Sequence, residues 1–258
     1  MITNFNNTPI QYKIIGNGPA LVLLHGFLLS PTIWTKIIPK LAKKNKVIIL
    51  DLPGHGKSGT ITEVHTMELM AEVVNHILKE LSVEKANFIG HSMGGYISLA
   101  FAEIYPDKIN TLVLLNSSSE ADSKERKINR TRAIKVIKTH KEAFINMGIA
   151  VLFKEEKQEE FQYLIEKFST EAFQFPVEGI IAAIKGMRDR KDRTSVLKNF
   201  KGKKYMISGI EDPIIPIFNS EKVALETNTK LHKVNSGHMS INENIDEIIN
   251  FLHFIEFL

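Results

Sequence analysis

Short apolar runs recur along the chain and alternate with stretches whose apolar residues follow a helical period. The runs are rich in β-branched residues and apolar at successive positions, which is typical of strands buried on both faces of a parallel sheet. They predict strands at residues 20–25, 46–51, 87–91, 111–116 and 203–209, and residues 229–235 predict a late strand.

Helical periodicity appears between these strands. Residues 67–81 and 93–105 carry apolar residues at helical spacing, and Pro106 ends the second stretch. Residues 245–258 predict a closing helix, while the alternation at 11–16 favours an antiparallel hairpin at the sheet edge. Because strands and helices alternate, the pattern indicates an α/β fold with a doubly wound, mostly parallel sheet.

This alternation of strands and helices stops after the sixth expected strand, when the edge hairpin is counted as two strands. Residues 117–199 are charged, helical in pattern and poor in strand signals, and they are too many for a simple loop. We therefore expect a core domain made of residues 1–116 and 200–258, with residues 117–199 inserted as a helical cap.

Composition narrows the classes of function. The 258 residues contain no cysteine, which excludes thiolate nucleophiles and Cys-based zinc sites, and no tight His/carboxylate motif predicts another metal. The net charge of +4 is spread along the chain rather than gathered in a basic, aromatic-interleaved block, so we expect no nucleic-acid partner. Lacking a signal-peptide pattern or a bilayer-length apolar run, the chain is expected to be cytoplasmic, without membrane insertion. Its oligomeric state stays open.

The most specific motif is G-x-S-x-G at residues 90–94, between an expected strand and an expected helix. A serine here sits on a strained turn with its hydroxyl above the sheet, and side chains at Gly90 and Gly94 would collide with backbone. The following helix directs its N-terminal N–H groups toward the same point. The structural alternative is that Ser92 only caps the helix.

Four further segments join this motif in a resemblance to the α/β-hydrolase superfamily. Residues 23–27 resemble its oxyanion loop, 50–58 its turn after the next strand, 207–216 its catalytic-acid segment and 235–239 its catalytic-histidine segment. The resemblance runs from about residue 11 to the end, and the order Ser92, Asp212, His238 matches the family's order.

The resemblance implies a role for each of these residues. Ser92 would be the nucleophile, His238 its general base, and Asp212 the carboxylate that orients His238. Glu211 is the competing carboxylate, and the family's alternative acid position holds Asn116 here. The oxyanion hole would use the backbone N–H groups of Phe27 and Met93, with Gly26 permitting the turn.

The substrate pocket is less well defined by sequence. Trp34, His91, Phe144 and Met147 are candidates for its wall, although packing between the cap and the sheet explains most apolar residues of this kind. His25, Asp51 and His55 are expected to brace loops. Arg188, Arg190 and Arg193 either clamp a substrate carboxylate or, as we favour, form exposed salt bridges.

The expected activity is hydrolysis of a small or medium carboxylic ester or lactone through an acyl-serine intermediate, with a small-molecule substrate and no cofactor. Within the superfamily, the chain resembles small-molecule esterases, enol-lactonases and C–C bond hydrolases. Two alternatives remain: cleavage of a C–C bond in a diketone, and a ligand receptor that retains the triad. Dehalogenases and epoxide hydrolases of this fold use an aspartate nucleophile, so Ser92 argues against both.

Overall fold

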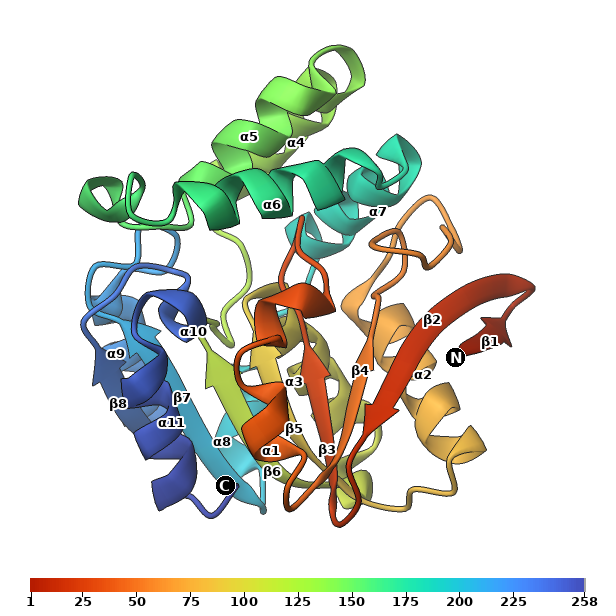
Figure 1. The fold of residues 1–258 in the computed structure, drawn as a ribbon, viewed down its shortest axis with the longest axis vertical. Coiled ribbons are helices and arrows are strands. Elements are labelled where there is room, and N and C mark those ends of the chain that lie inside the picture. The colour runs from red at the N-terminus through yellow and green to blue at the C-terminus, as the bar shows by residue number, and fades with distance from the viewer. Residues whose placement is uncertain (258) are drawn as a thin grey trace.

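An eight-stranded sheet runs through the computed structural model, which describes residues 1–257 (Figure 1). The strands lie in the order β1-β2-β4-β3-β5-β6-β7-β8. The neighbours from β4 through β8 pair in parallel, while β2 pairs antiparallel with both β1 and β4. The bounds are β1 Ile2–Phe5, β2 Thr8–Ile15, β3 Ala20–Leu24, β4 Lys46–Leu50, β5 Ala86–His91, β6 Ile109–Leu115, β7 Lys203–Gly209 and β8 Lys230–Val234.

The helices lie on both faces of this sheet and across one end of it. Their bounds are α1 Ile38–Leu41, α2 Met67–Glu80, α3 Met93–Ile104, α4 Lys124–Thr139, α5 Lys141–Ala150, α6 Gln162–Phe173, α7 Val177–Arg188, α8 Thr194–Asn199, α9 Ile217–Thr227, α10 Ser240–Glu243 and α11 Ile245–Phe254. Short 3₁₀ helices occur at Pro31–Trp34 (η1), Pro106–Lys108 (η2) and Glu155–Lys157 (η3).

The expected strands, the edge hairpin and the doubly wound sheet are confirmed. A hydrophobic core lies on each face of the sheet, and adjacent residues of a central strand point into opposite cores. In β3, Val22 and Leu24 pack in the core with α2 and α3, while Leu21 and Leu23 pack in the core with α11. Burial on both faces explains why these strands are apolar at successive positions. The predicted closing helix ends at Phe254, and residue 258 of that prediction lies outside the described residues.

The helices α4 to α7 stand over the carboxyl ends of the parallel strands (Figure 1). α4 buries only Ile137, whereas α7 docks closely on the core. A Cβ at Gly179 of α7 would lie 2.5 Å from the Cα of Gly54, so the two backbones touch. α8 instead packs against α3 and α9 beside the sheet.

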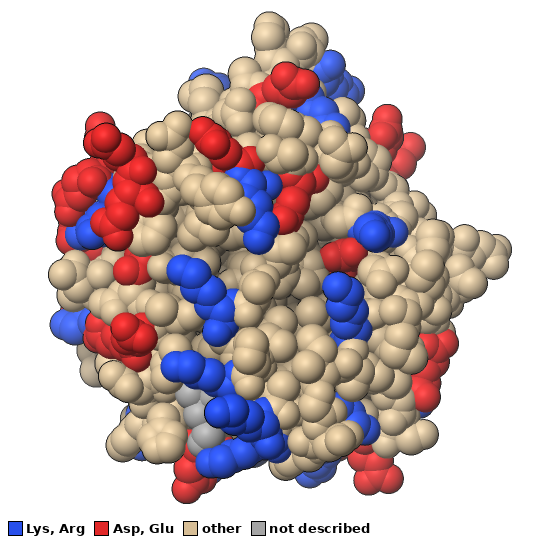
Figure 2. Space-filling model, viewed as in Figure 1, with Lys and Arg blue, Asp and Glu red and all other residues tan. Residues whose placement is uncertain are grey.

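Charge is dispersed over the surface shown in Figure 2. Lys and Arg are frequent in the lower centre of this face, where Figure 1 places α1, and Asp and Glu gather toward the left edge. Within residues 1–257, no helix is both long enough and apolar enough to cross a bilayer, and no group of three His, Cys, Asp or Glu side chains is placed to hold a metal ion.

Candidate active site

Ser92 lies at the sharp turn between β5 and α3. Its backbone adopts φ 51° and ψ −115°, a conformation that costs a residue with a side chain about 1–3 kcal/mol. A Cβ at Gly90 would lie 2.4 Å from the carbonyl oxygen of Gly94, and one at Gly94 would lie 2.2 Å from that of Leu24. Both glycines are therefore required, as the sequence predicted.

The surrounding backbone holds this turn in place. The N–H of Ser92 donates to the carbonyl of Leu115 at 3.0 Å, and the hydroxyl of Ser117 donates to the carbonyl of Ser92 at 2.7 Å. The Ser92 side chain makes no capping hydrogen bond to α3. Ser92 thus occupies the N-cap position of α3 without capping the helix through its hydroxyl, which does not support the alternative of a purely capping role.

Asp212 and His238 meet above the carboxyl ends of β7 and β8. His238 Nδ1 lies 2.7 Å from Asp212 Oδ2, and each side chain is about 1% exposed. The neighbouring Glu211 points elsewhere, since its side chain is half exposed and pairs with Lys154 Nζ at 2.6 Å. The structure thus joins Asp212, and not Glu211, to the histidine.

Several donors converge on the Asp212 carboxylate. Its Oδ1 accepts the N–H groups of Ile214 and Ile215 at 2.8 and 2.9 Å, and its Oδ2 accepts Asn116 Nδ2 at 3.1 Å. Burial alone raises the pKa of Asp212, but the charge of His238 and these hydrogen bonds outweigh it and leave that pKa below its usual value. The ionised carboxylate keeps the proton of His238 on Nδ1, which leaves Nε2 with a free lone pair.

The loop that carries His238 is held from three sides. Leu152, at the end of α5, accepts the backbone N–H of His238 at 2.9 Å. The carboxylate of Glu243 accepts the N–H groups of Gly237 and Met239 at 3.0 and 3.2 Å. His91 Nε2 lies 3.0 Å from the carbonyl oxygen of His238, which brings the histidine loop beside the residue that precedes Ser92.

Two unused backbone donors lie near the Ser92 turn. Within residues 1–257, no hydrogen bond uses the N–H of Phe27 or that of Met93. The two segments are close, because the carbonyl of Leu24 at the end of β3 lies against Gly94 in the first turn of α3. Leu28, next to Phe27, has φ 60°, an unusual conformation for a bulky residue that the tight loop imposes.

His25 links this loop to the segment that follows β4. Its Nε2 accepts the N–H of Leu52 at 3.0 Å, so its Nδ1 carries the proton and donates to the carbonyl of Gly26 at 2.8 Å. Asp51 accepts the N–H of Lys57, and His55 Nδ1 bonds to the carbonyl of Pro53. The expectation that His25, Asp51 and His55 brace loops agrees with these bonds.

The four candidates for the pocket wall fall in different surroundings. His91 is fully buried, and burial together with the charge of His238 lowers its pKa to about 3. Trp34 is buried in the core on the α11 side, and Phe144 packs against that core while partly exposed. Met147 is 74% exposed and lines a surface hollow with Lys154 and Glu211. The structure therefore does not gather the four around one cavity.

The three arginines form ion pairs, as favoured, but two of them are buried rather than exposed. Arg193 is 2% exposed and binds Glu68 and Glu103, at 2.6 and 3.0 Å. Arg190 binds Asp122 at 2.5 Å and lies 4.1 Å from the ring centre of Tyr96. Arg188 pairs with its neighbour Asp189 on the surface. These arginines fasten the helices of 117–199 to one another and to the core.

The residues that hold the site in place were not predicted from the sequence. Asn116 was noted only as a position without a carboxylate, yet it donates to both Asp212 and Gly237. Glu243 follows His238 by five residues and is the last residue of the short helix α10, and this spacing was a usable signal. The contact from Leu152 has no sequence signal, because it depends on how α5 ends above the sheet.

The family assignment rests on comparison as well as geometry. Residues 19–244 match the sequence model of the family described as "alpha/beta hydrolase fold". The structure is similar to a thermophilic esterase from Thermogutta terrifontis, with a TM-score of 0.90, 29% identity, and coverage of 96% of this chain and 93% of that one. The enol-lactonase from Burkholderia xenovorans LB400 has a similar fold, with a TM-score of 0.91, 22% identity, and coverage of 100% and 99%.

One curated relative is the pimeloyl-[acyl-carrier protein] methyl ester esterase of Aeromonas hydrophila. It is 36% identical over 110 residues, which is 42% of this chain and 42% of the relative. The chain thus spans less than half of the length of the curated relatives it matches. The family match covers most of the chain, so this protein belongs to the α/β-hydrolase fold family, and the resemblance seen in the sequence is confirmed.

Proposed function

We propose that this protein is a serine hydrolase that cleaves a small or medium carboxylic ester or lactone. The observation that carries the proposal is the buried Asp212–His238 pair beside a serine held on a strained, glycine-flanked turn. The similar proteins include esterases and an enol-lactonase, which supports cleavage of an ester or lactone bond. The reaction needs no cofactor.

In this mechanism His238 Nε2 takes the proton of the Ser92 hydroxyl while its oxygen attacks the ester carbon. The N–H groups of Phe27 and Met93 stabilise the oxyanion of the tetrahedral intermediate. His238 then gives the proton to the leaving alkoxide oxygen as the C–O bond breaks. Water repeats the sequence on the acyl-enzyme, releasing the acid, and Asp212 stabilises the imidazolium in both halves.

Residues 117–199 would act as the cap that limits the substrate. Leu152 supports this role because its carbonyl, at the end of α5, bonds directly to the His238 backbone. Trp34, Phe144 and Met147 stay predictions for substrate contact, and His91 is better suited to positioning His238. A cytoplasmic location and the absence of a nucleic-acid partner also remain predictions.

The test is kcat/KM for p-nitrophenyl acetate, butyrate, hexanoate, octanoate and dodecanoate. Each buried methylene contributes about 0.8 kcal/mol, so the rate constant should rise roughly fourfold per CH₂ until the pocket is full. We expect the maximum at a short or medium chain. A rise through dodecanoate would contradict a small pocket. A flat and barely measurable profile would favour the C–C hydrolase or receptor alternative.

A further inference from the structure

The loop that carries His238 and the proposed cap meet at one carboxylate, that of Glu243. Its Oε2 accepts the backbone N–H of Gly237 at 3.0 Å, and its Oε1 accepts that of Met239 at 3.2 Å. The backbone N–H of Lys154, in the cap segment that follows α5, donates to the same carboxylate. Glu243 thus binds the residues on both sides of His238 and joins them to the cap.

The glycine before His238 makes this close approach possible. A Cβ at Gly237 would lie 2.9 Å from the backbone nitrogen of Lys154 and 3.0 Å from Glu243 Oε1, so a larger residue would have to push these groups apart. The cap reaches the loop at a second point, because the carbonyl of Leu152 accepts the N–H of His238 at 2.9 Å. The cap segment therefore lies directly against the backbone of the histidine loop.

A carboxylate is well suited to hold several backbone N–H groups at once. Each of its oxygens has two lone pairs, and hydrogen bonds to an ionised acceptor are shorter and stronger than those to a neutral one. Burial raises the pKa of Glu243, while the three backbone hydrogen bonds and the charge of Lys154 oppose that rise. The backbone of the histidine loop therefore favours the ionised form of Glu243.

The position of His238 matters directly for the proposed reaction. Its Nδ1 lies 2.7 Å from Asp212 Oδ2, and its Nε2 must meet the hydroxyl of Ser92. A displacement of about 1 Å in a reacting group can lower a rate about 100-fold. A group that fixes the backbone on both sides of His238 therefore affects the rate without touching the substrate.

We propose that Glu243 is a positioning residue for His238, which it holds by fastening residues 237 and 239 to the cap segment at Lys154. This inference rests on the proposed serine hydrolase activity. Glu243 acts through the histidine and not on the reacting atoms. Its removal should consequently lower kcat and leave KM almost unchanged, because the lost support is needed in the transition state and not for substrate binding.

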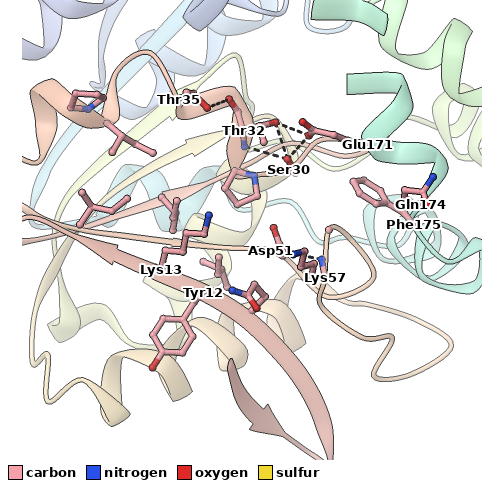
Figure 3. Close-up of a pocket in the computed structure, with 18 residues that line it drawn as sticks. Tyr12, Lys13, Ser30, Thr32, Thr35, Asp51, Lys57, Glu171, Gln174 and Phe175 are labelled. Carbon is pink, nitrogen blue, oxygen red and sulfur yellow. Dashed lines mark hydrogen bonds between the residues drawn. The ribbon is translucent and has the colours of Figure 1, made fainter. Parts of the chain in front are cut away.

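A second carboxylate provides the matched control. Glu171 of α6 also joins the cap to the core, since its Oε2 accepts the hydroxyls of Ser30 and Thr32, both at 2.7 Å (Figure 3). Like Glu243 it is half-buried, but it lies at a cavity on the sheet edge that His238 does not line. Glu171→Gln therefore loosens a contact of the cap without altering the histidine loop.

The first measurement is steady-state hydrolysis of p-nitrophenyl butyrate, expressed per active site by fluorophosphonate titration of folded protein. Glu243→Gln keeps one acceptor oxygen and should lower kcat about tenfold, whereas Glu243→Ala should lower it about 100-fold. KM should stay within about twofold of the parent value in both variants. Glu171→Gln should change kcat by less than about threefold. If Glu243→Ala does not fold, Glu243→Gln alone decides.

The second measurement does not depend on turnover. The Nδ1 proton of His238, in its hydrogen bond to Asp212, should give a resolved downfield resonance in the proton NMR spectrum. We expect both Glu243 variants to shift or broaden this resonance, because the loop that holds the imidazole loses its support. Glu171→Gln should leave the resonance unchanged.

Three results would overturn the proposal. The first is a kcat within about threefold of the parent value in the folded Glu243 variants. The second is an equal loss of kcat in Glu171→Gln, which would mean that Glu243 only fastens the cap. The third is a downfield resonance that the Glu243 variants leave unchanged. If the parent chain hydrolyses no ester, the proposed activity fails, and the resonance still decides whether Glu243 positions His238.

Discussion

Moving the proposed catalytic carboxylate from Asp212 to position 116 is the most demanding test of the site geometry. Asn116 Nδ2 lies 3.1 Å from Asp212 Oδ2, which in turn lies 2.7 Å from His238 Nδ1. A carboxylate at position 116 would therefore lie beside the group that now bonds the histidine. The pair of substitutions Asn116→Asp and Asp212→Asn exchanges the two groups across their existing hydrogen bond.

The expected magnitudes follow from this exchange. Asp212→Asn alone should lower kcat about ten-thousandfold, because an amide no longer holds the Nδ1–H tautomer. Adding Asn116→Asp restores one charge-assisted hydrogen bond to His238, worth about 1.5–3 kcal/mol, and should recover roughly 10- to 100-fold. Asn116→Asp alone places two carboxylates together, so one pKa rises and activity below neutral pH falls.

The assay is kcat/KM for p-nitrophenyl butyrate from pH 5 to 9, with circular dichroism as a check on folding. Asn116→Leu combined with Asp212→Asn is the matched control, because it changes the same position without adding charge. That control should show no recovery. If the charge-exchanged double variant is no more active than Asp212→Asn, position 116 does not reach the histidine and the geometry is wrong there.

Three further predictions follow from other parts of the structure. Glu211→Gln should change kcat/KM by less than about threefold, because Glu211 pairs with Lys154; a loss comparable to that of Asp212→Asn would reverse the assignment of the acid. The fully buried histidines should make the fold sensitive to acid: burial lowers the pKa of His55 and of His65 to about 4, so their neutral forms stabilise the fold fully above pH 6.5. Below pH 6.5, each of these two histidines should lower the free energy of unfolding by about 1.4 kcal/mol per pH unit as the pH falls toward 4. Urea unfolding measures this change, and a constant denaturation midpoint between pH 6.5 and 4.5 would refute it. Hydrogen exchange should be faster in α4 and α5 than in β5 and β6, whereas α7, docked backbone to backbone at Gly54, should exchange slowly; uniform protection would exclude a mobile outer cap.

The sequence predicted the sheet well because each central strand is buried on both faces. That burial makes successive residues apolar, as in β3 and β6. Such a pattern can be recognised without knowing which elements pack against the strand. The Ser92 turn was equally visible, since its geometry requires glycine at positions 90 and 94. These requirements concern only neighbouring residues, so a short stretch of sequence is enough to recognise the turn.

The supporting contacts were harder to predict because they join distant segments. Asn116 follows β6, but its partners follow β7 and β8. Arg190 and Arg193 look like surface residues in a charged stretch, yet they are buried by partners from other elements. The burial of a charged residue can be predicted only when its oppositely charged partner is known.

The central claim is that Ser92 is the nucleophile, and active-site labelling tests it most directly. The protein is treated with a fluorophosphonate, and the modified peptide is identified by mass spectrometry while hydrolysis of p-nitrophenyl butyrate is followed. We predict one label per chain on Ser92, loss of activity in proportion to labelling, and neither label nor turnover in folded Ser92→Ala. Labelling at another residue, or more than a few per cent of the activity in Ser92→Ala, would contradict the account.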